Sequence, residues 1–393
     1  MRVTNSMLKS NLMRNLHINY NRSDKLQNKM STGRRFANIS DDPTALIYSQ
    51  AARNKMARLS HFQRSTETSK SWLAQAENSM KELQDVLVNA YESIVDAATD
   101  GKTQVDRQNI AQVIGQLRDH YVDTLNSTFG NNFVFGGYNT PGDAETNLFD
   151  KGIKPFTIEN GKLMYNGFDL SQFDGMSGDL LNFNPSGFNF YNGSNPADPL
   201  SGSQGDVELQ AYLAGLGHPT PAAFTASTGI AYNQLLKLHA LRGDVLTLDV
   251  GPGISMKATF NGIDMALFQG MDDSNTPIIR NAYNVLTDAY NQTMDNTSTF
   301  GAADLTKIIR PLQEGQNHLL MRIAEAGGRT RRLELLEARY EQDQVNNRQM
   351  LSDAEDVDMA EVIMELRMAE AVMQASMAAG ARIIQPSLMD FLR

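Results

Sequence analysis

The sequence predicts a mainly α-helical fold with a β-rich insertion, in which the N- and C-terminal helices pair into a coiled-coil or rod bundle. Apolar residues recur at helical spacing over long stretches near both ends, whereas the middle is rich in Gly, Asn and Pro. The ends also differ in charge: residues 1–64 contain twelve Lys and Arg against three acidic residues, and residues 352–393 contain eight acidic residues against three Arg. Because opposite charges favour neighbouring helices, the two ends are expected to lie side by side.

The composition of the chain excludes several classes of protein. With 393 residues, 41% of them hydrophobic, the chain can form two or three domains with real cores. A formal net charge of −10 argues against nucleic acid as a partner, and the absence of cysteine excludes disulfides, thiolate metal sites and thiol catalysis. No apolar run approaches the roughly 18–20 residues of a membrane span, and residues 1–16 are too polar for the core of a signal peptide. We therefore expect no nucleic-acid or membrane partner, in a protein that is cytoplasmic or exported without cleavage.

A first helix is predicted over residues 5–32. Its seam follows heptad spacing with two polar positions, and consists of Leu12, Leu16, Asn19, Ser23, Leu26 and Met30. Gly33 lies where a C′ glycine ends a helix. Asp42 is the expected N-cap of the next helix, with the two preceding residues as alternates, because Pro43 suits a first helical turn. The predicted helix-break and cap motif is Gly33, Asp41, Asp42 and Pro43.

The second helix has the most regular pattern in the chain. From Leu59 to Ala97 its apolar and small residues alternate spacings of 3 and 4 without a break, over a length of about 58 Å at 1.5 Å per residue. This length is typical of a rod. Asp100-Gly101 interrupts the pattern, and a third helix around 110–121 is expected to pack antiparallel on the second.

The middle of the chain predicts a β-rich domain. Residues 133–135 resemble a short strand, and two Asn-Gly pairs at 160–161 and 166–167 are strong hairpin signals. Residues 174–206 have the composition of surface loops, and strand patterning resumes over 245–268, with turns expected at 251–253 and 261–262. Short helices are expected near 207–214 and 231–241.

Helical periodicity returns over residues 278–295 and 302–350. Pro311 and Gly327-Gly328 are expected to kink or interrupt the second of these helices. Ser352 and Glu355 have capping-box spacing and are expected to open the last helix. That helix has two apolar rows, so it needs more than one partner. One row is Ala360, Met364, Met368, Ala371, Ala375 and Ala378, and the other is Val362, Leu366, Ala369, Met373 and Met377.

This order of elements predicts three domains. A terminal coiled-coil domain combines residues 1–40 with 352–393, and a helical rod combines 41–138 with 278–351. Residues 139–277 form the inserted β-rich outer domain. The residues predicted to form an assembly interface are Leu12, Leu16, Leu26, Met30, Val362, Leu366, Met373, Met377 and Leu388.

The polar residues do not form a recognisable reaction centre. The six histidines are scattered, and capping explains Asp41 and Asp42 without a metal or a reaction. The acidic stretch 353–361 lacks the glycine and the frame of a calcium loop, and no phosphate-binding loop or nucleophile motif occurs. We therefore expect no catalytic residues, no cofactor, no metal and no enzyme activity. On these residues alone, the alternative to a structural protein is a coiled-coil adhesin, or an enzyme whose active site lies in the insertion.

Several motifs resemble the bacterial flagellin family. They are MSTGRR at 30–35, SDDP at 40–43, FVFGG at 133–137, LSDAEDVDMAE at 351–361 and SLMDFL at 387–392, in the order found in that family. The start MRVTNSML and the form of the MSTGRR and SDDP motifs resemble the proteins of the hook-filament junction more than filament flagellins. The resemblance implies a structural junction adaptor of the bacterial flagellum, with filament-forming flagellin as the alternative.

The resemblance also implies partners and location. These are other copies of the chain in a ring, the adjoining hook-associated protein and flagellin, and an export chaperone on the C-terminal helix. It implies an extracellular protein on the flagellum that leaves through the flagellar type III apparatus without a cleaved signal peptide.

Overall fold

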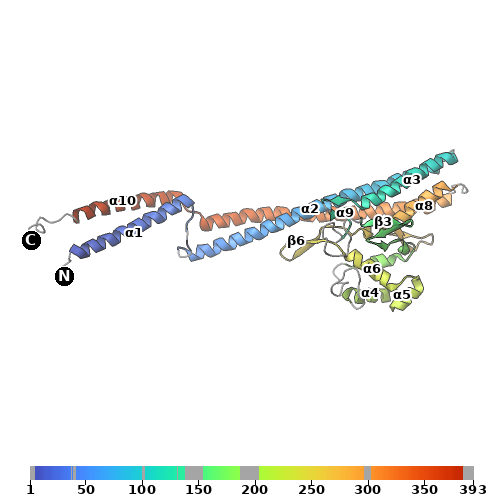
Figure 1. The fold of residues 1–393 in the computed structure, drawn as a ribbon, viewed down its shortest axis with the longest axis horizontal. Coiled ribbons are helices and arrows are strands. Elements are labelled where there is room, and N and C mark those ends of the chain that lie inside the picture. The colour runs from blue at the N-terminus through green and yellow to red at the C-terminus, as the bar shows by residue number, and fades with distance from the viewer. Residues whose placement is uncertain are drawn as a thin grey trace, which may run out of the picture. The chain divides into compact units, whose positions relative to one another are not determined.

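The fold is mainly helical, with small β-sheets, as the sequence predicted (Figure 1). The computed structural model describes residues 5–36, 38, 41–99, 102–130, 132–137, 154–185, 203–295 and 302–383. The chain forms two compact units, which are residues 1–61 with 338–393, and residues 62–337. The predicted three-domain boundaries stay a prediction. Among the described helices, none has an apolar stretch long enough to cross a membrane.

Six long helices make up most of the chain. They are α1 (Asn5–Thr32), α2 (Pro43–Ala97), α3 (Gln104–Leu125), α8 (Ala282–Met294), α9 (Ala302–Glu355) and α10 (Met359–Ile383). The residues of the regular pattern predicted from Leu59 to Ala97 form the buried face of α2. Four of them are fully buried, namely Leu73, Ala76, Met80 and Leu83. The polar members of this face, Thr66 and Ser69, are buried too, and each hydroxyl donates to the carbonyl oxygen four residues earlier.

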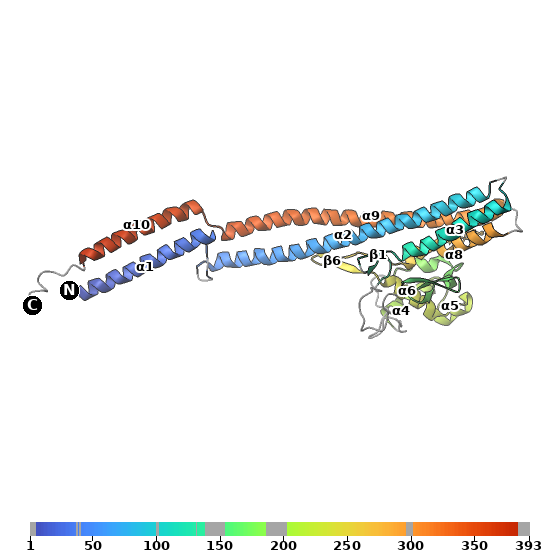
Figure 2. The same ribbon diagram turned by 45° about the horizontal axis from the view of Figure 1, so that its top comes forward.

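The closest packing of α3 is with α8 rather than with α2, which was the expected partner. Gly115 allows this approach, because a Cβ atom added there would lie 3.3 Å from the Tyr290 ring. The capping box of Thr103 and Asp106 starts α3. Figure 2 shows α3 and α8 side by side, next to α2 and α9.

Among the described residues, the strands form four small antiparallel sheets rather than one large sheet. The pairs are β1 (Thr128–Phe129) with β2 (Asn132–Phe133), β6 (Thr247–Gly251) with β7 (Ile254–Lys257), and β8 (Leu267–Met271) with β9 (Pro277–Asn281). The three-stranded sheet contains β3 (Phe156–Glu159), β4 (Lys162–Tyr165) and β5 (Phe168–Asp169). Both predicted Asn-Gly turns are confirmed: Asn160, Gly161, Asn166 and Gly167 all have positive φ, which this type of tight turn requires.

Short helices fill much of the insertion. They are η1 (Ser171–Phe173), η2 (Gly178–Asn182), α4 (Gln204–Gly215), α5 (Pro221–Thr228), α6 (Tyr232–Gly243) and α7 (Ile263–Ala266). The helices α4 and α6 agree with those predicted near 207–214 and 231–241, whereas α5 was not predicted. The signal for α5 was present, since Thr220 caps the helix, Pro221 begins it and Gly229 ends it in the left-handed conformation.

Three local predictions were wrong in detail. The turn expected at 261–262 is instead the start of α7, where the Asn261 side chain accepts a hydrogen bond from the Ile263 N–H. The helix expected from residue 278 begins at Ala282, because 277–281 pair with β8. Val134 and Phe135 follow the strand β2 and are buried in the core instead of extending it.

A kink or an interruption was expected at Pro311 and at Gly327-Gly328, and the structure shows no interruption, since α9 continues through both places. Pro311 removes one backbone donor and each Gly costs about 1 kcal/mol. Packing holds the helix on both sides of these positions: Ile308 and Leu312 are buried around Pro311, and Ala326 and Leu333 are buried around the two glycines. Ser352 lies in the last turn of α9 and does not open the next helix. Asp358 caps α10 instead, because its Oδ1 accepts from the Ala360 N–H at 2.8 Å.

We predict that Gly262→Ala lowers the free energy of unfolding by about 1–3 kcal/mol, because overpacking forces the backbone to shift. A Cβ atom at this position would lie 2.6 Å from the Phe135 carbonyl oxygen and 2.7 Å from the Phe156 ring. Urea unfolding measures the change. The matched control is Gly327→Ala, where no atom lies within 4 Å and the added methyl group should stabilise the helix by up to about 1 kcal/mol. Equal effects of the two variants would contradict this account.

Candidate assembly interface

The first and last described helices, α1 and α10, pack against each other in antiparallel orientation. At one end of the pair, a Cβ atom on Gly380 would lie 2.8 Å from Leu12. Further along, the Asn19 amide donates to Ser376 Oγ at 3.2 Å, and at the other end the Val357 N–H donates to the Gly33 carbonyl at 3.1 Å. Residue numbers therefore rise along one helix as they fall along the other.

The seam of this pair contains most of the residues that the sequence singled out. Three residues of the seam are buried, namely Leu26, Val362 and Ala369. The other predicted residues of the seam are partly buried, and they are Leu12, Leu16, Met30, Leu366 and Met373. Asn19 and Ser376 form a polar pair within this apolar surface. A single satisfied polar pair of this kind favours one register, because any slip would leave its partners without hydrogen bonds.

Two residues of the predicted interface do not belong to the buried seam. Met377 is 49% exposed, and Leu388 lies outside the described residues. The seam therefore brings seven of the nine predicted residues to one surface inside a single chain.

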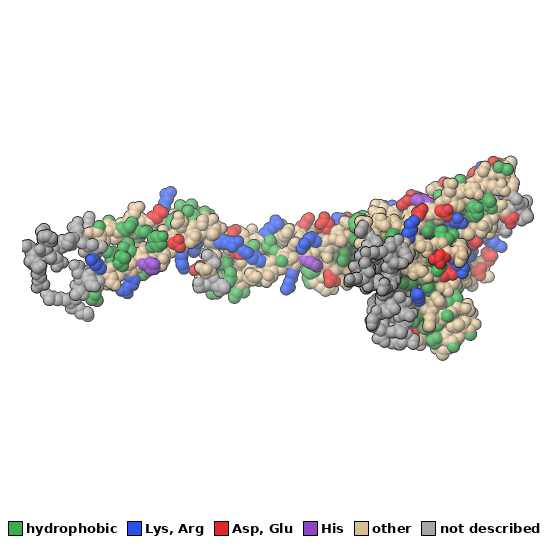
Figure 3. Space-filling view, in the orientation of Figure 1, with side chains coloured by type: hydrophobic (Ala, Val, Ile, Leu, Met, Phe, Trp, Pro, Cys, Tyr) green, Lys and Arg blue, Asp and Glu red, His purple; other side chains and the backbone are tan. Residues whose placement is uncertain are grey.

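The apolar row of α10 that contains Met364 and Met368 is exposed. Met364 and Met368 are 63% and 62% exposed, and Ala360, Ala371, Ala375 and Ala378 are exposed with them. At 3.6 residues per turn, this row lies on roughly the opposite side of the helix from the seam. On α1, the exposed apolar residues Met13, Ile18 and Tyr20 were missed by the sequence analysis, which followed only the seam. Hydrophobic side chains are visible on the surface of the terminal helices in Figure 3. We call Ala360, Met364, Met368, Ala371, Ala375 and Ala378 the outer row.

The segment between α1 and α2 is held by short polar contacts. Gly33 has φ +68° and its N–H donates to the Lys29 carbonyl, which ends α1. Asp42 Oδ1 accepts from the Ala45 N–H at 3.0 Å, and Pro43 is the first residue of α2. Asp41 forms an ion pair with Lys25 at 3.2 Å. The two carboxylates therefore cap and tie the segment together.

Glu355, at the end of α9, joins three parts of the chain. Its carboxylate accepts hydrogen bonds from Arg53 Nε at 2.8 Å and Arg53 NH2 at 2.7 Å, and a further one from the Ser49 hydroxyl. Arg34 Nε lies 3.9 Å from the same group. Its backbone carbonyl accepts from the Arg35 N–H at 2.6 Å, next to an antiparallel bridge between Arg34 and Asp356. We call Glu355, Arg53, Ser49 and Arg34 the Glu355 clasp.

The electrostatics of the clasp favour an ionised carboxylate. Hydrogen bonding to Arg53 lowers the pKa of Glu355 below its ordinary value, and this outweighs the opposite effect of burial. The Glu355 hydrogen bond in turn raises the pKa of Arg53. From its spacing to Ser352, Glu355 is predicted to be part of a capping box. An acidic residue at a helix C-terminus opposes the helix dipole, so its position was a signal for a cationic partner, but the sequence does not say which.

No three His, Asp or Glu side chains gather closely enough to hold a metal ion within the described part of the chain.

Removing Arg53 should loosen the clasp. Arg53→Ala leaves the 10% exposed Glu355 carboxylate with fewer donors, and the expected cost is about 1–2 kcal/mol, since Arg53 itself stays 44% exposed to screening solvent. Hydrogen exchange of the Arg35 and Val357 amides should become about 5 to 30 times faster. Arg58→Ala, which removes an exposed arginine from the same helix, should leave these rates unchanged.

The clasp should also weaken at acid pH. Because the pKa of Glu355 is lower in the folded chain than its ordinary value of 4.5, the carboxylate stabilises the fold fully above that value. This stabilisation is lost as the pH falls through the lower folded pKa. The difference in amide protection between the wild type and Glu355→Gln, corrected for intrinsic exchange, should therefore be constant near pH 7 and vanish at strongly acid pH. A difference that persists there unchanged would contradict an ionic clasp.

The N-terminal helices are similar in sequence to those of known proteins. Residues 3–140 match the bacterial flagellin N-terminal helical region. The flagellar hook-associated protein 3 of Escherichia coli (strain K12) is 28% identical over 173 residues, which are 44% of this chain and 51% of that protein. A flagellin of Clostridium tyrobutyricum is 27% identical over 126 residues, which are 32% of this chain and 33% of that protein. The chain thus matches a third to a half of the length of these relatives.

A solved structure shares the fold. It is a candidate flagellar hook-associated protein from Vibrio parahaemolyticus, with a TM-score of 0.52 and 14% identity, and the match covers 80% of this chain and 100% of that one. At this identity the likeness concerns the fold alone. Through its N-terminal helical region, this chain is similar to bacterial flagellins, and over a longer stretch it is similar to hook-associated protein 3.

Proposed function

We propose that this protein is a structural component of the bacterial flagellum that joins the hook to the filament. The observation that carries the proposal is the outer row of α10, which stays uncovered when α1 and α10 are paired. A row of two Met and four Ala on a paired helix gains stability when another apolar surface covers it. The similarity to hook-associated protein 3 supports the flagellar setting.

In this proposal the terminal helices assemble with other copies of the chain in a ring, and the ring adjoins another hook-associated protein on one side and flagellin on the other. Before assembly, an export chaperone covers the C-terminal helix, since the outer row would otherwise promote aggregation. The protein acts outside the cell, after export without a cleaved signal peptide, and carries out no catalysis. Filament-forming flagellin is the alternative, and the shorter match to a flagellin supports it less well.

Deletion of the gene in its own host tests the proposal. A junction adaptor predicts hooks without filaments, together with intact flagellin released into the medium. A filament flagellin predicts hooks without filaments and a medium that lacks this chain and any other flagellin. Complementation with the wild-type chain restores filaments in either case, so the medium distinguishes the two functions.

Substitution of the outer row should separate folding from assembly. Met368→Asp places a carboxylate on an exposed position, so the free energy of unfolding should change by no more than about 0.5 kcal/mol while incorporation into flagella is lost. The control is Gln374→Asp, which adds the same charge to an exposed polar position of α10 and should assemble normally.

The seam should respond differently. Leu366→Asp puts a charge between α1 and α10, so it should loosen the pair already in the free subunit, seen as faster hydrogen exchange in both helices. Normal incorporation of Met368→Asp would count against the outer row as the subunit contact.

A further inference from the structure

The outer row of α10 contains two side chains that can be oxidised. Alanine has no reactive group, so the chemistry of the row lies in the thioethers of Met364 and Met368. These residues are four apart, which places them next to each other on the same face of the helix. The chain contains no cysteine, so a peroxide meets no thiol that would react before methionine. The two thioethers are therefore the principal targets of a peroxide in the outer row.

Exposure differs widely among the methionines of the chain. Met364 and Met368 are 63% and 62% exposed, whereas Met80 and Met265 are 0% and 1% exposed. A peroxide must reach the sulfur atom to oxidise it, so a buried methionine of the folded chain reacts more slowly. Met321 of α9 is 64% exposed and is a reference for a methionine with similar access outside α10. Oxidation of the folded chain should therefore select the exposed methionines.

Oxidation would change the outer row from apolar to polar. Hydrogen peroxide transfers one oxygen atom to the sulfur, which loses two electrons and becomes a sulfoxide, and the peroxide is reduced to water. The sulfoxide oxygen is a hydrogen-bond acceptor, and the four alanines of the row offer it no side-chain donor. An apolar surface that covered the row would leave this oxygen without a partner. Burial of an unpaired acceptor costs free energy, so association would weaken.

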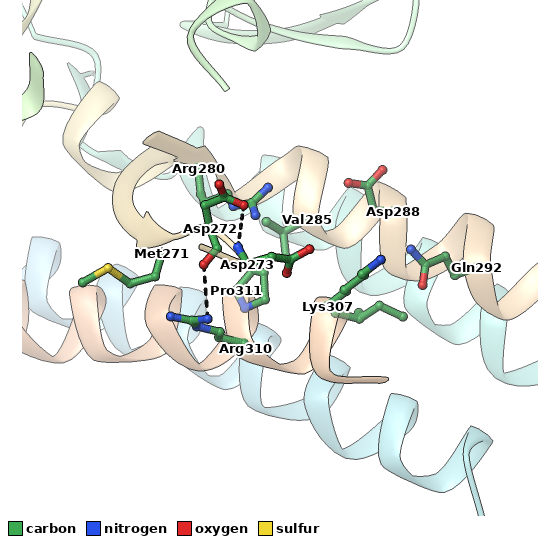
Figure 4. A pocket seen from close by; sticks show the side chains of 11 residues that line it. Met271, Asp272, Asp273, Arg280, Val285, Asp288, Gln292, Lys307, Arg310 and Pro311 are labelled. Carbon is green, nitrogen blue, oxygen red and sulfur yellow. Dashed lines mark hydrogen bonds between the residues drawn. The ribbon is translucent and has the colours of Figure 1, made fainter. Parts of the chain in front are cut away.

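Met271, at the end of β8, is a methionine in polar surroundings. It is 38% exposed and lines a cavity of about 230 Å³ between the β8–β9 turn, α8 and α9. Arg280, Lys307 and Arg310 line the same cavity (Figure 4). Their side chains carry N–H donors, so a sulfoxide oxygen at Met271 would have donors and solvent around it. Oxidation at this position should therefore leave no acceptor unpaired, in contrast to oxidation of a covered outer row.

We propose that Met364 and Met368 form a redox-sensitive modification site, at which conversion to methionine sulfoxide blocks assembly of the free subunit. The inference rests on the proposed function, because it requires that another apolar surface covers the outer row. The modifying agent is a peroxide. The change is reversible, since a methionine sulfoxide reductase restores the thioether and releases the oxygen as water while a dithiol is oxidised to a disulfide. In assembled subunits the covered thioethers would be protected.

Peptide mass spectrometry of the purified full chain after treatment with hydrogen peroxide tests the site itself. We expect oxidation of Met364, Met368 and Met321 at comparable rates, and of Met80 and Met265 about tenfold or more slowly. Circular dichroism should show unchanged helix content. Oxidation of the outer row no faster than that of Met80 would overturn the proposal. This measurement involves no assembly, so its result does not depend on the proposed function.

Binding to hooks isolated from the deletion strain tests the effect on assembly. The peroxide-treated chain should bind about tenfold or more weakly than the untreated chain, the loss typical of a buried polar group without a partner. A methionine sulfoxide reductase with dithiothreitol should restore binding. Equal binding before and after oxidation would overturn this inference alone. Failure of the untreated chain to bind would contradict the proposed function and, with it, the effect on assembly.

Leucine variants identify the responsible methionines. A double variant with Met364→Leu and Met368→Leu keeps apolar side chains of similar volume but cannot be oxidised at these positions, so it should bind equally before and after peroxide treatment. The matched control Met321→Leu removes an equally exposed methionine of α9 and should lose binding after treatment, as the wild type does. Loss of binding by the oxidised double variant would assign the effect to other methionines and overturn the proposal.

Discussion

The structure depends on closing the chain between segments that are 302 residues apart at the Glu355 clasp. For a flexible chain, closure over this length costs about 5 kcal/mol. Residues 62–337 reduce this cost because they fold on their own core and hold α2 beside α9, where Lys70 and Glu337 form an ion pair at 2.9 Å. The loop that remains to be closed at the clasp is therefore much shorter than 302 residues.

Polar and apolar contacts have separate tasks at the terminal pair. Three polar contacts define which residues of the two helices meet. They are the clasp, the backbone bridge between Arg34 and Asp356, and the hydrogen bond between Asn19 and Ser376. In another register, the donors and acceptors of these contacts would lose their partners. The apolar seam supplies contact area without such selectivity. The outer row supplies area that a single chain does not use. One apolar side of α10 is thus covered by α1 within the chain, and we propose that the other apolar side is covered during assembly.

The insertion is organised by side chains more than by its sheets. Each sheet is small. Asn126 forms hydrogen bonds with the N–H and the carbonyl of Phe156, and the Asn261 amide donates to the carbonyls of Leu241 and Asp244. One contact between this region and α9 is polar. Among the described residues, Arg310 of α9 donates to the Asp272 carbonyl and to Asn275 Oδ1, and so binds the turn between β8 and β9.

The sequence by itself determined the elements that depend on local chemistry. Helical periodicity, the Asn-Gly turns and the order of helical and β-rich segments are encoded by neighbouring residues, so they could be predicted. Only the tertiary structure decided which partner each face meets. In the tertiary structure, α3 packs on α8 at Gly115, and α9 continues through Pro311 because its flanking residues are buried. One apolar row of α10 is buried or partly buried against α1, and the other is exposed. The tertiary structure also brings Glu355 to Arg53. These outcomes depend on the packing and desolvation of residues distant in sequence, for which local spacing contains no information.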